Sequence, residues 1–149
     1  MAFELHEIRK TSINARPYCG PAALMAFSGK DFEEVRALIN KVRGREHNKP
    51  VRGLSNHHLR GVIGKLGYST DTMIPAHRFT VHDFAETVKP DEFWFVIAGH
   101  HYVVMCEGLV ADNRIRFGCE VAKHPWRRRI VKEAIRVIHP EESLARFAA

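Results

Sequence analysis

The chain has 149 residues, of which 45% are hydrophobic and 27% are charged, and its formal net charge is +6 at pH 7. This composition suits a globular protein that buries a core of its own, and it excludes a chain that is disordered for lack of apolar residues. We expect a single domain over residues 1–149. Cys19, Cys106 and Cys119 are odd in number and far apart, which argues against a disulfide framework and against a zinc-ligand pair.

The stretch NARPYCGPAALMAF, residues 14–27, predicts the first helix. Pro21 suits a first helical turn because the N–H that it lacks would have no partner there, so Cys19 is expected at the helix N-terminus. The helix dipole and a nearby imidazolium can lower a cysteine pKa from about 8.5 to roughly 3.5–7.5. Gly20 leaves room for a substrate carbonyl beside backbone N–H groups that suit an oxyanion. Cys19 is therefore a candidate nucleophile, although a buried packing cysteine fits the same pattern.

Three further helices are predicted where an N-capping residue precedes apolar residues at helical spacing. Their caps are Asp31, Ser55 and Thr80, and their apolar patterns run to Val42, Leu66 and Val88. Two continuous apolar runs then predict strands, FWFVIA at 93–98 and HYVVMC at 101–106. The first half of the chain is therefore expected to be helical and the second half to form a sheet, which is an α+β fold class.

Only Glu107 and Gly108 separate the second strand from LVAD, a length and composition that suit a two-residue hairpin turn. If Cys106 pairs with Leu109, side chains that alternate with period two place His101 and Asp112 on one face as diagonal neighbours. An imidazole and a carboxylate can then meet. A one-residue bulge would instead bring His100 and Asn113 to that face.

Two segments, PYCGPAAL and GHHYVVMCEGLVADN, resemble the papain-like cysteine peptidase superfamily. The likeness is to small bacterial and phage proteins and to the peptidases that process double-glycine bacteriocin leaders. It implies a papain-like fold in which an N-terminal helical part packs on a C-terminal antiparallel β-sheet. It also implies that Cys19 is the nucleophile, that His101 is the general base and then acid, and that Asp112 orients the imidazole. His101 is preferred to His100 because an aromatic residue follows it, as in the family pattern.

The sequence departs from the family pattern at two points. The family has a glutamine about half a dozen residues before the cysteine, whereas the nearest amide here is Asn14. We expect Asn14 to form the oxyanion hole with Cys19 and Gly20. The short loop after the histidine strand also leaves Asn113 as a rival of Asp112 for the third triad position.

The resemblance predicts a cysteine-dependent hydrolase that cleaves a peptide, isopeptide or related amide bond in a protein or peptide substrate. Transamidases and cell-wall endopeptidases on the same fold are alternatives, because the sequence does not show whether water or an amine resolves the thioester. We expect no cofactor and no metal. The adjacent pair His57 and His58 lacks the i, i+4 spacing that puts two metal ligands on one helix face.

An alternative from another class is a catalytically silent, basic binding module for nucleic acid or a protein partner. Its basis is the positive charge gathered at 41–53 and 123–129, where Trp126 is suited to stacking on a base. The start of the chain lacks the pattern of a secretory signal, and no window approaches the ~18 apolar residues of a membrane span. We therefore expect a cytoplasmic protein of a bacterial or phage-infected cell, without membrane association.

Overall fold

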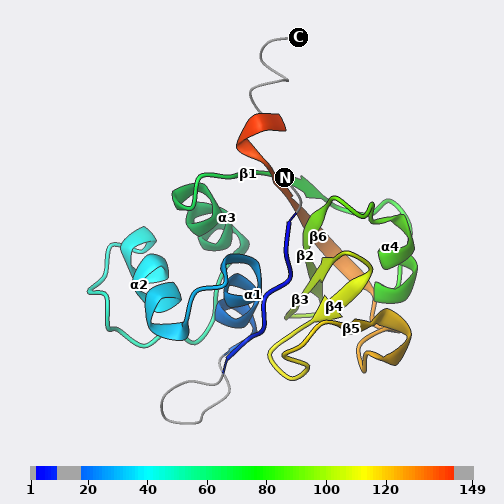
Figure 1. Cartoon of the computed structure of the whole chain (residues 1–149), viewed down its shortest axis with the longest axis horizontal. Helices are drawn as coiled ribbons and strands as arrows, with labels where there is room; N and C mark the ends of the chain where they lie inside the picture. Colours follow the sequence, from blue (N-terminus) through cyan, green and yellow to red (C-terminus); the bar gives the residue numbers. More distant parts are fainter. Residues whose placement is uncertain (1–2, 10–17, 143–149) are drawn as a thin grey trace.

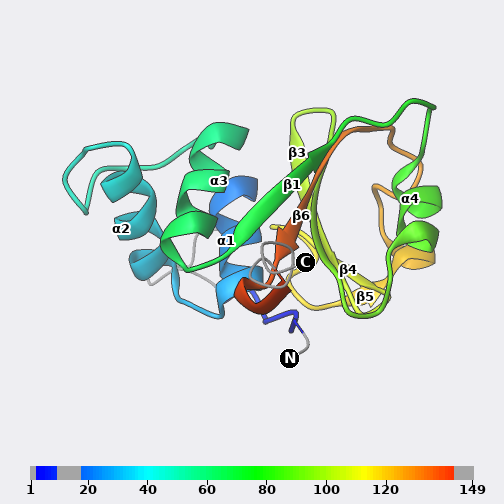
Figure 2. The same cartoon turned by 90° about the horizontal axis from the view of Figure 1, so that it is seen from above.

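The computed structural model describes residues 3–9 and 18–142, and these form a helical part beside a β-sheet (Figure 1). The helical part holds α1 (Cys19–Ser28), α2 (Phe32–Val42) and α3 (Asn56–Lys65). A short helix, α4 (Val81–Thr87), covers the opposite side of the sheet, as Figure 2 shows. A 3-10 helix, η1 (Val121–Lys123), lies between the last two strands in the chain.

In the described residues, six strands form one sheet in the order β1-β6-β2-β3-β4-β5, and neighbouring strands are antiparallel. They are β1 (Ser69–Met73), β2 (Phe93–Ala98), β3 (His101–Cys106), β4 (Leu109–Ala111), β5 (Cys119–Glu120) and β6 (Val131–Ile138). The predicted α+β class, with helices packed on an antiparallel sheet, is confirmed.

The three predicted N-caps act as expected. The side chain of Asp31 accepts a hydrogen bond from Glu34 N, and the Thr80 hydroxyl accepts one from Asp83 N. The Ser55 hydroxyl does the same for the backbone N–H of His58 at the start of α3. Each cap satisfies one of the N–H groups that a helix start leaves without an intrahelical partner, which fixes where these helices begin.

The predicted hairpin register is also confirmed, because Cys106 pairs with Leu109. Glu107 and Gly108 both have positive φ, 55° and 76°, as a type I′ turn requires. The division into a helical first half and a sheet second half is wrong for β1, which precedes α4 in the chain and pairs with β6. β1 reads STDTM and is mostly exposed, so its sequence has no apolar pattern from which a strand could be predicted.

The sheet is covered on both faces, and β3 contributes to both cores. Tyr102 and Val104 face the core under the helical part, whereas Val103 and Met105 face the core under α4. α1 packs on β3 and is buried along its length from Gly20 to Phe27. Cys19, the first residue of α1, and His101, the first residue of β3, therefore lie where the helical part meets the sheet.

Candidate active site

Cys19 is the first residue of α1, and its side chain is half-buried. The next residue lies under the loop that precedes α3, since a Cβ built on Gly20 would come within 2.6 Å of Leu54 Cβ. Only glycine fits there without displacing that loop. The close packing therefore holds the helix start, and with it the thiol, in a fixed position.

The ring of His101 and the backbone N–H groups of Tyr102 and Gly20 interact with the thiol of Cys19 and favour its ionised form. Burial alone raises a thiol pKa, but these donors and the charge of His101 lower the pKa of Cys19 overall. His100 contributes its backbone carbonyl, which lies 3.9 Å from Sγ. The ring that meets the sulfur is thus that of His101, at the start of β3.

The other side of the His101 ring meets Asp112, with 2.8 Å between Nε2 and Oδ2. Because Nε2 is engaged by the carboxylate, Nδ1 is the ring nitrogen left to interact with the thiol. Burial of the imidazole lowers its pKa, but the hydrogen bonds and charges of Asp112 and Cys19 raise the pKa of His101 to about 9. The arrangement therefore favours a thiolate beside an imidazolium.

Asp112 is 2% exposed and follows directly after β4. Its Oδ1 accepts hydrogen bonds from Arg114 N at 2.9 Å and Ile115 N at 2.7 Å. Burial opposes its ionisation, but His101, His124 and these backbone donors hold the pKa of Asp112 well below its usual range. Between the two residues that the sequence left as rivals, the carboxylate at the imidazole is that of Asp112 rather than a group of Asn113.

Trp126 and His124 lie beside His101 and Asp112, although the sequence did not predict that they belong to the site. The ring of Trp126 stacks on His101, with 4.4 Å between centroids and 24° between planes. His124 is fully buried, and its Nε2 lies 3.3 Å from Asp112 Oδ2. Both come from the irregular segment after η1, where no periodicity indicates which side chains turn inward.

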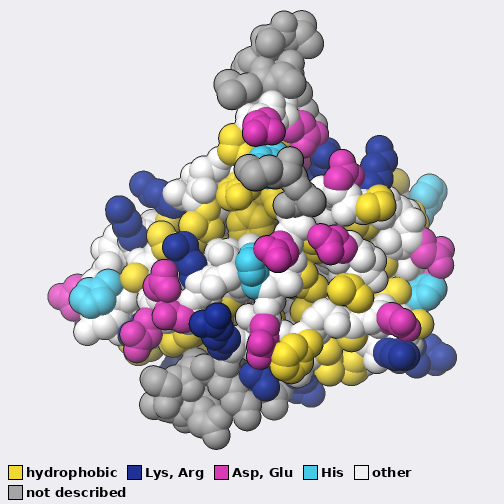
Figure 3. All heavy atoms as spheres, viewed as in Figure 1, with side chains coloured by type: hydrophobic (Ala, Val, Ile, Leu, Met, Phe, Trp, Pro, Cys, Tyr) yellow, Lys and Arg dark blue, Asp and Glu magenta, His cyan; other side chains and the backbone are white. Residues whose placement is uncertain are grey.

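Trp126, the aromatic residue of this basic segment, therefore packs within the molecule, although Lys123, Arg128 and Arg129 beside it are exposed. One face of the indole is occupied by His101, and the Arg129 guanidinium lies 4.4 Å from the ring centroid. On the face seen in Figure 3, lysine and arginine side chains are interspersed with acidic ones rather than gathered in one patch. Nothing in the described residues supports the nucleic-acid binding that the composition suggested.

The other two cysteines differ from Cys19 in their surroundings. Burial and the charges of Glu107 and Glu4 raise the pKa of Cys106 to about 11. Burial and nearby carboxylates also raise the pKa of Cys119. Cys106 packs in the core under the helical part. A cysteine with a lowered pKa is found in the described residues only at position 19.

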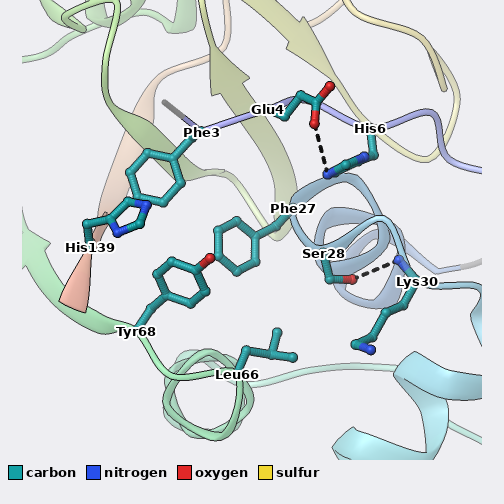
Figure 4. A pocket seen from close by; sticks show the side chains of 9 residues that line it. All are labelled: Phe3, Glu4, His6, Phe27, Ser28, Lys30, Leu66, Tyr68 and His139. Atoms are coloured by element: carbon teal, nitrogen blue, oxygen red, sulfur yellow. Dashed lines mark hydrogen bonds and ion pairs between the residues drawn. The ribbon is translucent and has the colours of Figure 1, made fainter. Parts of the chain in front are cut away.

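A separate pocket of about 330 Å³ lies at the other end of α1 (Figure 4). Its aromatic lining includes Phe27, near the end of α1, together with Phe3, Tyr68 and His139. Phe27 lies eight residues after Cys19, which at 1.5 Å per residue is roughly 12 Å along the helix. The pocket is therefore not part of the Cys19 site.

Asn14, which the sequence predicted to complete the oxyanion hole, lies outside the described residues. Within the described ranges, no group of three histidine, cysteine or acidic side chains is placed to hold a metal ion. None of the described helices has both the length and the apolar character needed to cross a bilayer.

No protein-family model and no curated protein matches the sequence. The fold is similar to the crystal structure of the peptidase domain of Streptococcus ComA, a bifunctional ABC transporter involved in a quorum-sensing pathway. The two chains are 18% identical, the match covers 91% of this chain and 98% of the other, and the TM-score is 0.54. The likeness shows that the chain has the papain-like fold of a peptidase domain, so the resemblance drawn from the two sequence segments is confirmed for the fold.

Proposed function

We propose that the protein is a cysteine peptidase that cleaves a peptide, isopeptide or related amide bond through Cys19, His101 and Asp112. The observation that carries the proposal is the chain of contacts from the Cys19 thiol through the His101 ring to the buried carboxylate of Asp112. A papain-like fold alone would not carry it, since one fold serves several functions. The contacts support the proposal because such a reaction needs a nucleophile, a base and an orienting group close to one another.

In the first half of the reaction, the thiolate of Cys19 attacks the carbonyl carbon and the carbonyl oxygen becomes an oxyanion. The backbone N–H of Cys19 at the helix start and the amide of Asn14 are the donors that we assign to this oxyanion. Gly20, the third residue expected there, has a backbone N–H that helps to lower the pKa of the thiol before the attack. As the C–N bond breaks, the imidazolium of His101 gives its Nδ1 proton to the leaving amine, which leaves a thioester on Cys19.

In the second half, neutral His101 takes a proton from water, and the hydroxide attacks the thioester. The product leaves as a carboxylic acid that gives its proton to solvent, Sγ leaves as thiolate, and His101 keeps the proton that it took from water, which restores the starting ion pair. Asp112 holds Nε2 throughout, so Nδ1 stays directed at the reacting atoms. Trp126 covers one face of the imidazole and limits access of water to the hydrogen bond between His101 and Asp112.

The test is incubation with a mixed peptide library, read by mass spectrometry for new peptide ends. We expect cleavage by the unmodified protein and none above background by Cys19→Ala. A cysteine variant outside the site, Cys119→Ala, is the matched control and should cleave normally. Added hydroxylamine separates hydrolysis from acyl transfer, because transfer gives a hydroxamate at the new carboxyl end. Cleavage that survives Cys19→Ala would overturn the proposal.

A further inference from the structure

His124 is a fully buried imidazole that the proposed reaction does not use. A buried polar ring needs hydrogen-bond partners, and the first of them is the backbone N–H of Trp126, 3.1 Å from Nδ1. A backbone N–H can only donate, so Nδ1 of His124 accepts. The ring proton is therefore on Nε2, and His124 can donate only from that atom.

Nε2 of His124 points to the orienting carboxylate. It lies 3.3 Å from Asp112 Oδ2, the same oxygen that His101 Nε2 contacts at 2.8 Å. No hydrogen bond of this buried Nε2 forms within the described residues, so its 3.3 Å approach to Oδ2 is a close contact of the imidazole with the carboxylate, and no other acceptor competes for the nitrogen. Since the backbone donors of Arg114 and Ile115 take Oδ1, the carboxylate is surrounded by two backbone and two imidazole N–H groups.

We propose that His124 is a positioning residue that fixes the orientation of Asp112, and through it the His101 ring; this inference rests on the proposed function. The side-chain torsion that turns a carboxylate is broad, so bonds to Oδ1 alone leave Oδ2 free to move out of line with His101. A second donor at Oδ2 restricts that rotation. His124 and Trp126 thus act from one short segment, His124 on the carboxylate and Trp126 on the imidazole.

The first test measures the tautomer of His124 in the unmodified protein, by NMR of ¹⁵N-labelled imidazoles at pH 7. We expect the ring proton on Nε2 and a lone pair on Nδ1. A proton on Nδ1 would overturn the proposal, because Nε2 would then have nothing to donate to Asp112. This measurement does not depend on any variant folding.

The second test compares His124→Leu, which fills the site without a donor, with His124→Gln, whose amide can donate near the position of Nε2. We expect His124→Leu to shift the acidic limb of Cys19 alkylation toward that of an ordinary thiol and to lower kcat for peptide cleavage roughly 10- to 100-fold, with KM little changed. His124→Gln should recover much of both. A partly exposed histidine on α4, His82, gives the matched control His82→Leu, which should leave the alkylation profile unchanged.

The alkylation readout needs no substrate, so the two proposals can fail separately. If no peptide is cleaved but His124→Leu still shifts the alkylation profile, the proposed function fails and the positioning role stands. If peptides are cleaved but a folded His124→Leu keeps the wild-type pH profile of alkylation, the positioning role is wrong. Loss of stability without a change in that profile would likewise show that His124 only packs.

Discussion

At the scale of single residues, the site combines a thiol whose pKa is lowered with an imidazole whose pKa is raised to about 9. Each ionised group stabilises the other, so the ion pair exists between the lowered pKa of Cys19 and about pH 9. The raised pKa of His101 also adds stability to the fold. That contribution is fully present below the unfolded pKa of about 6.5 and is lost as the pH rises through about 9.

We therefore predict that iodoacetamide alkylates Cys19 at pH values where an ordinary thiol, with a pKa of about 8.5, is protonated. Replacing His101 with alanine removes the main hydrogen bond that lowers the pKa of Cys19, so the midpoint of alkylation should rise toward that of an ordinary thiol. Peptide cleavage should fall above about pH 9, where His101 loses its proton, while alkylation continues. Mass spectrometry of the alkylated peptides, measured across the pH range, checks both limbs.

Cys106 and Cys119 are internal controls in the same experiment, because the pKa of each is raised. They should stay largely unmodified at pH 7 while Cys19 reacts. Equal profiles for the unmodified protein and His101→Ala would show that the imidazole does not activate the thiol.

At the scale of elements, the start of α1 depends on the close contact between Gly20 and Leu54. We predict that Gly20→Ala destabilises the protein by about 1–3 kcal/mol, because the new Cβ would lie 2.6 Å from Leu54 Cβ and the loop before α3 would have to move. Since Cys19 is the adjacent residue, its rate of alkylation should fall as well. Denaturant unfolding and alkylation at a fixed pH measure the two effects.

Gly64 supplies the matched control, since it lies within α3 and a Cβ there would meet nothing within 4 Å. Alanine is favoured over glycine in a helix, so Gly64→Ala should stabilise the protein by up to about 1 kcal/mol and leave Cys19 unaffected. If Gly20→Ala is as well tolerated as Gly64→Ala, the loop is not held against the helix start as the structure indicates.

The elements that the sequence predicted are those whose signals are local. A cap and an apolar stripe lie within about a dozen residues, and the turn at Glu107 and Gly108 sets the register of its own hairpin. That register brought His101 and Asp112 together from sequence alone. β1 was missed because it is a polar edge strand whose partner, β6, lies some sixty residues later, and no local pattern reports such pairing.

Trp126 and His124 were missed in the same way. The sequence showed an exposed-looking basic loop, and only the folded chain shows that this loop returns to the β3–β4 hairpin and covers His101 and Asp112. Chemistry that depends on one hairpin could be predicted, whereas the residues that support it come from a segment with neither periodicity nor a turn signal.

At the scale of the whole molecule, the site lies between the helical part and the sheet, and it depends on their positions relative to each other. The thiol belongs to the helical part, and the imidazole and carboxylate belong to the sheet. A polar network joins the two parts behind the site. Tyr102 donates its hydroxyl to Leu54 O at 3.1 Å and to Asn56 Oδ1, and the amide of Asn56 donates to Glu133 on β6.

Tyr102 is 5% exposed, and burial, with the charges of Cys19 and Glu133, raises its pKa, so its hydroxyl stays protonated and remains a donor. We predict that Tyr102→Phe destabilises the protein by about 0.5–1.5 kcal/mol, because it leaves two partly buried acceptors without this donor and changes almost nothing else in volume. The backbone N–H of Tyr102, which helps to lower the pKa of Cys19, is unaffected by the change. The loss should therefore appear as faster hydrogen exchange in the loop before α3 and near the start of α1, with the pH midpoint of Cys19 alkylation nearly unchanged.

Tyr68→Phe, in the pocket at the far end of α1, removes a hydroxyl outside this network and serves as the control. If both variants lose the same stability and neither changes exchange near α1, the network does not hold the two parts of the molecule together.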